Sequence, residues 1–317
     1  MEWTTRTANG RTPTGEVYRG PMPLRNAADR LTKGAPPEAL FVLSGISMYC
    51  GAAVAVHTFD DLGAVGVAWW RVFGAAVMLL ILRRSWRTGW TKRQVLLAGL
   101  FGTVLAGMNT TFYLAIDRLP LGTTVAIEFL GPVAVAAVGS RTRRAWLALL
   151  LAAAGVGVLA DVQMEASLSG LVFALCAAAL WAGYIVLGAR VASEARAIDG
   201  LAVGMLIGAV VIAPIGLRSA LGVIGAWWLL VPALATALLS NVIPYGIDQV
   251  VLRRISRARF ALLLALLPVT ATDIGFIALQ QTPAWAEALG IALVVTGIAV
   301  SGRSPRETPD VVEAVGS

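Results

Sequence analysis

Charged residues, cysteine and histidine are scarce in this chain of 317 residues. Only 14% of its residues are charged, whereas 58% are hydrophobic. A soluble domain cannot bury that much apolar surface, so the composition predicts a polytopic helical membrane protein. The single histidine, His57, argues against a histidine-based metal site. The two cysteines, Cys50 and Cys176, both lie in apolar segments, so no disulfide framework is expected.

Sequence motifs of membrane enzymes and pumps are also missing. No GxSG segment accompanies His57, which excludes a rhomboid-like protease. The only adjacent acids, Asp60 and Asp61, lie in a short loop, which argues against a metal-dependent lipid transferase. No GxxxxGK[ST] segment is present, so this chain alone cannot drive transport with ATP. We therefore expect no enzyme activity, no cofactor and no bound metal.

Ten apolar segments follow residue 38, and their lengths are close to the roughly 20 residues that a helix needs to cross a membrane. The connections between them are mostly short, so neighbouring helices should be antiparallel. We predict an all-α membrane protein with ten transmembrane helices. The helices are expected at residues 39–57, 63–82, 94–116, 121–139, 145–160, 168–189, 198–217, 228–251, 258–279 and 284–302.

Positive charge is distributed unevenly between the loops. The tails and the even-numbered loops carry 22 Lys and Arg residues, the odd-numbered loops carry 2, and Arg71 lies within the second helix, which accounts for all 25. Because cytoplasmic loops are enriched in Lys and Arg, both termini are predicted to be cytoplasmic. Residues 1–38 contain no apolar core of a signal peptide, so we expect a disordered cytoplasmic tail there and a second tail at 303–317.

The two halves of the chain share features in opposite orientation. An Asn-x3-Tyr pattern in the third segment recurs 132 residues later, and a proline in the fourth segment recurs 136 residues later. Equivalent loops differ in charge: residues 83–93 hold five Lys and Arg, whereas 218–227 hold one. Because each half has five helices, an odd number, the second half enters the membrane from the face opposite to that of the first. We therefore predict two inverted repeats, 39–161 and 168–302, with a site near the midplane at their interface.

Three ionisable side chains lie within the predicted spans: Arg71, Glu128 and Asp273. In the predicted orientation each lies about 10 Å below the outer end of its helix, so a shared polar cluster is expected. Intramembrane charges are costly and usually face a cavity or pathway. We expect an acid to take up protons or bind a substrate ammonium, and Arg71 to bind a carboxylate. The alternative is a buried Arg71–Glu128 pair that only fixes packing.

Amide and aromatic side chains form a second group of candidates. Asn241, Tyr245 and Asp248 share one helical face, where they would bind a small polar solute or bond between helices. For Asp248, an ion pair with nearby arginines is the alternative. Trp181 and Tyr184 are expected either to line a vestibule or to pack against other helices. The other candidates are Asn109 and Tyr113, and the prolines expected to kink their helices are Pro132, Pro244 and Pro268.

Five short blocks carry a resemblance to a known family. They are Gly107-Met-Asn-Thr-Thr-Phe-Tyr113, Leu119-Pro-Leu-Gly122, Ala126-Ile-Glu128-Phe-Leu-Gly-Pro132, Leu180-Trp-Ala-Gly-Tyr184 and Pro244-Tyr245. Through these blocks the chain resembles the drug/metabolite transporter superfamily, specifically the EamA-type carriers of the threonine/homoserine exporter group. The resemblance extends over residues 40–302.

The resemblance implies ten helices in two inverted EamA repeats, an inner-membrane location and export of small metabolites, amino acids among them. It also implies cavity roles for Arg71, Glu128 and Pro132. The chain departs from the group in three places, one of which is Asp273, at a position where those relatives are usually apolar. Leu267 stands where the exporters usually carry an acid, and Gln280-Gln281 stands where they tend to have Gly-Glu.

We therefore predict a secondary-active exporter of a small metabolite, with threonine and homoserine as the first candidates, that works by alternating access. Proton antiport is a hypothesis motivated by the buried acids. The expected partners are a small-molecule substrate, protons and membrane lipid but no nucleic acid, and the expected state is a monomer or homodimer. Two alternatives stay open: a multidrug or cationic-metabolite exporter of the same superfamily, and a non-transporting membrane scaffold.

Overall fold

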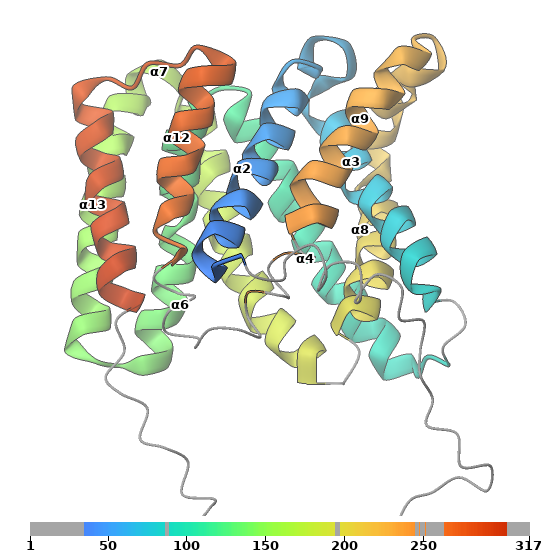
Figure 1. Cartoon of the computed structure of the whole chain (residues 1–317), viewed down its shortest axis with the longest axis horizontal. Coiled ribbons are helices and arrows are strands. Elements are labelled where there is room, and N and C mark those ends of the chain that lie inside the picture. The colour runs from blue at the N-terminus through green and yellow to red at the C-terminus, as the bar shows by residue number, and fades with distance from the viewer. Residues whose placement is uncertain are drawn as a thin grey trace, which may run out of the picture.

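The chain folds into a bundle of apolar helices (Figure 1). The computed structural model describes residues 35–85, 89–193, 197–244, 247, 251 and 263–302, and the regular structure within these ranges is entirely helical. Nearly all of the predicted tail at 1–38, and all of that at 303–317, lies outside the described residues.

The helices follow the predicted apolar segments closely. In chain order they are α2 (Pro37–Val56), α3 (Phe59–Arg83), α4 (Lys92–Ile116), α5 (Leu121–Glu128), α6 (Leu130–Ser140), α7 (Arg143–Ser193), α8 (Ala197–Ala220), η2 (Leu221–Ile224), η3 (Trp227–Leu229), α9 (Leu230–Ala237), η4 (Leu238–Val242), α12 (Leu266–Leu279) and α13 (Trp285–Gly302).

Apolar helices correspond to the predicted spans. Within the described ranges, eight helices are long and apolar enough to cross a membrane, and two shorter apolar helices cover Trp227–Val242 and Leu266–Leu279. The long α7 contains two of the eight spans, because its backbone becomes extended at Ser167, where φ is −161° and ψ is 89°. The expected all-α membrane architecture is therefore confirmed.

Glycines bring α4 and α8 into close contact. A Cβ at Gly102 would overlap the backbone of Gly204, and a Cβ at Gly208 would overlap the carbonyl of Gly102. The Gly-x3-Gly spacing of α8 therefore serves packing within the chain, as small residues do between membrane helices. Together with α3, these helices enclose a hydrophobic core whose fully buried members include Val72, Leu105 and Met205.

The loops near 83–93 and 218–227 lie at opposite ends of the bundle. Arg83 Nε, at the end of α3, lies 3.6 Å from Asp199 Oδ1 at the start of α8. At the other end of α3, Leu62 packs near Gly222 in η2. Figure 1 shows the end of α3 at the lower end of the bundle and η2 at the upper end. The inverted arrangement of the two halves stays a prediction.

Two helices begin two residues before a proline. The span at 121–139 is divided at Phe129, which precedes Pro132 and has φ −64° and ψ −14°. Helix α12 begins after Ala265, which precedes Pro268 and has nearly the same φ of −64° and ψ of −17°. Equivalent helix breaks therefore occur 136 residues apart, in the two halves of the chain.

Proline chemistry explains both breaks. Because proline has no N–H group, a helical proline leaves the carbonyl four residues earlier without its usual bond. That carbonyl belongs to Glu128 for Pro132 and to Leu264 for Pro268. A third proline, Pro244, follows the π-helical turn η4 by two residues. All three prolines predicted to distort helices thus lie next to an irregular turn.

Candidate functional site

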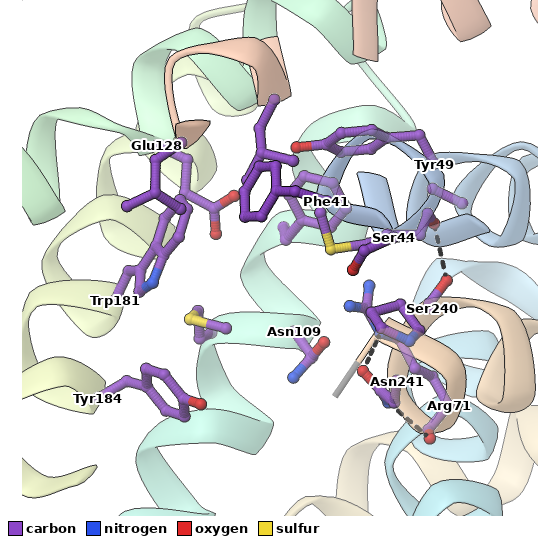
Figure 2. Close-up of a pocket in the computed structure, with 17 residues that line it drawn as sticks. Phe41, Ser44, Tyr49, Arg71, Asn109, Glu128, Trp181, Tyr184, Ser240 and Asn241 are labelled. Carbon is purple, nitrogen blue, oxygen red and sulfur yellow. Dashed lines mark hydrogen bonds between the residues drawn. The ribbon is translucent and has the colours of Figure 1, made fainter. Parts of the chain in front are cut away.

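A cavity of about 210 Å³ lies between the two halves of the chain. Helices α2 to α5 contribute one part of its wall, and the second part of α7, η4 and the start of α12 contribute the other (Figure 2). Most of the wall is apolar or aromatic, with a few polar groups. The lining residues are Phe41, Ser44, Met48, Tyr49, Ala52, Arg71, Met108, Asn109, Phe112, Glu128, Trp181, Tyr184, Ser240, Asn241, Pro244, Leu264 and Leu267.

Arg71 of α3 is the only lysine or arginine in the cavity wall among the described residues. Its Nε donates a hydrogen bond to Asn241 Oδ1 at 3.3 Å, and Asn241 Nδ2 donates to the Arg71 carbonyl at 3.2 Å. The guanidinium carbon lies 5.3 Å from the ring centre of Tyr113 and 6.0 Å from that of Phe112, within reach of a cation–π interaction. The Arg71 guanidinium is therefore held by an amide and two aromatic rings, all of them neutral.

Glu128 is the acidic residue of the cavity wall. It ends α5 at the helix break, and 7% of its surface is exposed. Within the described part of the chain, no hydrogen bond or ion pair satisfies its carboxylate. In particular, Glu128 and Arg71 form no ion pair within 4.0 Å. The alternative of a buried pair that only fixes packing is therefore not what the structure shows.

Three further predicted residues lie in the same wall. Asn109 Nδ2 donates to the Leu105 carbonyl at 2.7 Å, and Figure 2 shows the Asn109 amide between the sides that carry Arg71 and Tyr184. Trp181 packs edge-on against Phe129, with ring centres 4.7 Å apart. Tyr184 lines the cavity near Trp181. These side chains provide aromatic surface and one amide beside the two charged groups.

Asp273 does not join the cluster that its depth predicted. It is exposed on α12 and does not line the cavity, so the structure brings together two of the three ionisable residues. The buried residues of α12 include Leu267, Ala271 and Gly275, which are spaced by four. Asp273 is offset by two residues from this face, or about 200° around the helix. Tyr245 and Asp248 lie outside the described residues.

Some residues of the cavity were not predicted. Tyr49 and Ser240 both line it. Ser240 lies beside Asn241 because η4 is a π-helical turn, and an apolar sequence pattern does not reveal such a turn. Tyr49 belongs to the apolar helix α2, whose sequence does not show which of its faces lies toward the cavity.

A second buried polar cluster, outside the cavity wall, was also not predicted. The Glu287 carboxylate accepts hydrogen bonds from Gln163 Nε2, from Thr123 Oγ1 at 3.2 Å and from the Ala284 amide at 2.8 Å. These contacts connect α13 with α7 and α5. Its carboxylate is therefore satisfied within the protein, in contrast to that of Glu128.

Comparisons with known proteins agree with this architecture. The family described as "EamA-like transporter family" matches residues 168–303, which almost coincide with the predicted second repeat. A solved crystal structure aligns with a TM-score of 0.52 at 20% sequence identity, covering 83% of this chain and 96% of that one, which supports the fold alone.

Curated relatives are similar over most of the sequence. The threonine/homoserine exporter RhtA of Salmonella typhimurium (strain SL1344) is 33% identical over 278 residues, covering 87% of this chain and 94% of that protein. RhtA of Escherichia coli (strain K12) is 33% identical over 262 residues, covering 82% and 88%. These relatives are named as exporters and not as enzymes. Their similarity, the matching family and the helical membrane fold lead to one conclusion: the chain belongs to the EamA-like transporter family.

Proposed function

We propose that this protein exports small zwitterionic amino acids, with threonine and homoserine as the first candidates. The observation that carries the proposal is that Glu128 and Arg71 line one cavity without pairing with each other. A buried charge is stable only when an opposite charge or hydrogen bonds satisfy it. An amino acid supplies an ammonium for Glu128 and a carboxylate for Arg71. The relatives named threonine/homoserine exporters support the same substrate class.

The size of the cavity favours a small substrate. Its volume of about 210 Å³ is below the roughly 300–1,000 Å³ that is usual for pockets that hold drug-sized ligands. The aromatic residues Trp181 and Tyr184, together with Glu128, would also suit a lipophilic cation. Arg71 opposes that alternative, because its charge in the same wall would repel a cation. A zwitterion satisfies both observations.

The helix breaks support alternating access between the two halves. Transporters with inverted repeats bind substrate near the midplane, where discontinuous helices meet. In this chain the equivalent breaks at Phe129 and Ala265 adjoin Glu128 and Leu264, which line the cavity on its two sides. We infer that rocking of residues 39–161 against 168–302 exposes the cavity to one face at a time. The excess of arginine in the even-numbered loops supports cytoplasmic termini in the inner membrane.

The environment of Glu128 supports proton antiport. Its carboxylate has no partner among the described residues, and a charged group in this position is costly without one. In the empty cavity a proton neutralises it. A substrate ammonium can replace that proton, so the binding of protons and of substrate should be mutually exclusive. An inward proton gradient would then drive the amino acid outward.

Flux measurements in proteoliposomes test this function. Liposomes are loaded with labelled threonine or homoserine, and efflux is measured with and without a pH gradient. We expect efflux that the gradient accelerates, and loss of the acceleration in Glu128→Gln. Efflux independent of the gradient would contradict proton coupling. Competition by lipophilic cations instead of amino acids would favour a multidrug exporter, and the absence of any flux would favour a scaffold.

A further inference from the structure

The cation of the cavity is held by a residue from the other half of the chain. Asn241 uses both ends of its side-chain amide on Arg71: the oxygen accepts from Nε, and the nitrogen donates to the Arg71 carbonyl (Figure 2). An amide oxygen can only accept and an amide nitrogen can only donate, so this double contact fixes the orientation of the amide. Arg71 belongs to α3 and Asn241 to η4, 170 residues apart.

This contact determines which edge of the guanidinium remains available. A guanidinium has five N–H donors, and the one on Nε is committed to Asn241. The rings of Tyr113 and Phe112 lie close to the guanidinium carbon, at 5.3 and 6.0 Å. Among the described residues, no hydrogen bond of standard geometry holds the two terminal nitrogens, and the Tyr113 hydroxyl lies beside the guanidinium. These nitrogens form the edge that can bind a carboxylate with two parallel hydrogen bonds.

Asn241 is itself held firmly in place. It is 2% exposed and lies in the π-helical turn η4. Two hydrogen bonds connect this turn to α2: Ser240 Oγ donates to the Met48 carbonyl at 3.0 Å, and Ser47 Oγ donates to the Leu239 carbonyl at 2.8 Å. A binding group works best when its supporting residues are themselves fixed. The turn therefore provides a rigid support for Arg71.

We propose that Asn241 is the positioning residue of a carboxylate subsite. It holds the Arg71 guanidinium so that both terminal nitrogens receive the substrate carboxylate. Recognition of the carboxylate thus depends on contact between the two halves of the chain. This inference rests on the proposed export of amino acids and adds to it the group of the substrate that Arg71 recognises. It assigns no direct contact between Asn241 and the substrate.

The test compares Asn241 with a buried residue of the preceding helix α9 that does not line the cavity. The KM and kcat for threonine efflux are measured for wild type, Asn241→Leu and the matched control Thr236→Val, which loses a bond to the Gly51 carbonyl of α2 but none to Arg71. We expect Asn241→Leu to raise KM about 10- to 100-fold, as loss of hydrogen bonding to a charged group does, with kcat nearly unchanged. Thr236→Val should leave KM within about twofold, because its lost bond does not reach the guanidinium.

A double-mutant cycle separates positioning from a general structural role. If Asn241 acts through Arg71, Asn241→Leu should add little to the KM of Arg71→Lys. Additive effects, or an unchanged KM in Asn241→Leu, would overturn the inference. Asn241→Ser provides a second variant if the leucine variant does not fold. If wild type shows no flux of threonine or homoserine, the proposed function fails, whereas normal flux with an insensitive Asn241 rejects only the subsite.

Discussion

Gln163 on α7 donates a hydrogen bond to the carboxylate of Glu287 on α13, and both side chains are buried. With the bonds from Thr123 and the Ala284 amide, this carboxylate is satisfied without any ligand. Glu128 has no such partners among the described residues. The Glu287 carboxylate is therefore held by hydrogen bonds within the protein, whereas Glu128 faces the cavity.

Glu287 should contribute mainly to stability. We expect Glu287→Ala to lower the free energy of unfolding by about 2–4 kcal/mol, because three donors lose their acceptor in a buried site. Thermal unfolding in detergent measures the loss. Asp273→Asn is the control, since Asp273 is an exposed acid of the same region of sequence, and it should change the melting temperature little. An unchanged melting temperature for Glu287→Ala would contradict the role of the cluster.

Threonine should stabilise the wild-type protein against unfolding. A ligand that binds only the folded state contributes about 2.7 kcal/mol at 100 times its Kd. We expect this stabilisation to be lost in Glu128→Gln, because the amide cannot pair with the substrate ammonium. The measurement is the melting temperature of the purified protein over a titration with threonine. An equal threonine-induced shift in both proteins would mean that Glu128 does not bind the ammonium.

Asn109 should recognise the hydroxyl group of the substrate. Its nitrogen donates to the Leu105 carbonyl, so its oxygen remains as an acceptor in the cavity wall. We expect Asn109→Leu to reduce the preference for threonine over 2-aminobutyrate, which lacks the hydroxyl, by about tenfold. Efflux of the two amino acids is compared in proteoliposomes.

The control for Asn109 is the next residue of α4. Thr110 is buried and donates to the Ala106 carbonyl at 2.8 Å, but it does not line the cavity. Thr110→Val should therefore leave the preference unchanged. Equal loss of both substrates in Asn109→Leu would indicate that Asn109 acts on packing alone.

The contact between α4 and α8 should tolerate no side chain at Gly102. A Cβ there would overlap the backbone of Gly204, which cannot move as a flexible side chain can. We expect Gly102→Val to destabilise the protein by about 3 kcal/mol or more, at the upper end of overpacking effects. Gly139→Val is the control, because a Cβ at Gly139 meets no atom within 4 Å. Detergent-solubilised yield and melting temperature report the difference.

The two halves should have their equivalent loops on opposite faces of the membrane. Gly89 and Gly225 are exposed in the loops near 83–93 and 218–227. In a protein with Cys50 and Cys176 replaced by alanine, Gly89→Cys should react with an impermeant reagent only after the cells are permeabilised. Gly225→Cys should react in intact cells. Labelling of both positions from the same side would reject the inverted arrangement.

Arg71 and Glu128 could be predicted from the sequence to line a cavity, because a charge in an apolar span is too costly to face lipid. The same reasoning failed for Asp273. Depth along a helix can be counted from its ends, but the direction of a side chain depends on how the helix is rotated. Packing against other helices determines that Leu267 and Ala271 lie on the buried face of α12.

The contact between Arg71 and Asn241 was not predictable, although both residues were candidates. Residues 170 positions apart meet only when the two halves of the bundle pack together. The π-helical turn also changes which residues of that segment face the cavity, and no propensity or spacing in the sequence indicates such a turn. The sequence thus identified the chemistry of these side chains and the structure identified their partners.

The breaks before Pro132 and Pro268 lie in the cavity wall itself, since Glu128 and Leu264, the residues four positions before the two prolines, are lining residues. A bend at either break would change the shape of the cavity directly, without any change in the helices between them. A ligand that bridges the two walls would in turn stiffen both breaks. Binding of a ligand in the cavity and bending at the two breaks would then be directly coupled.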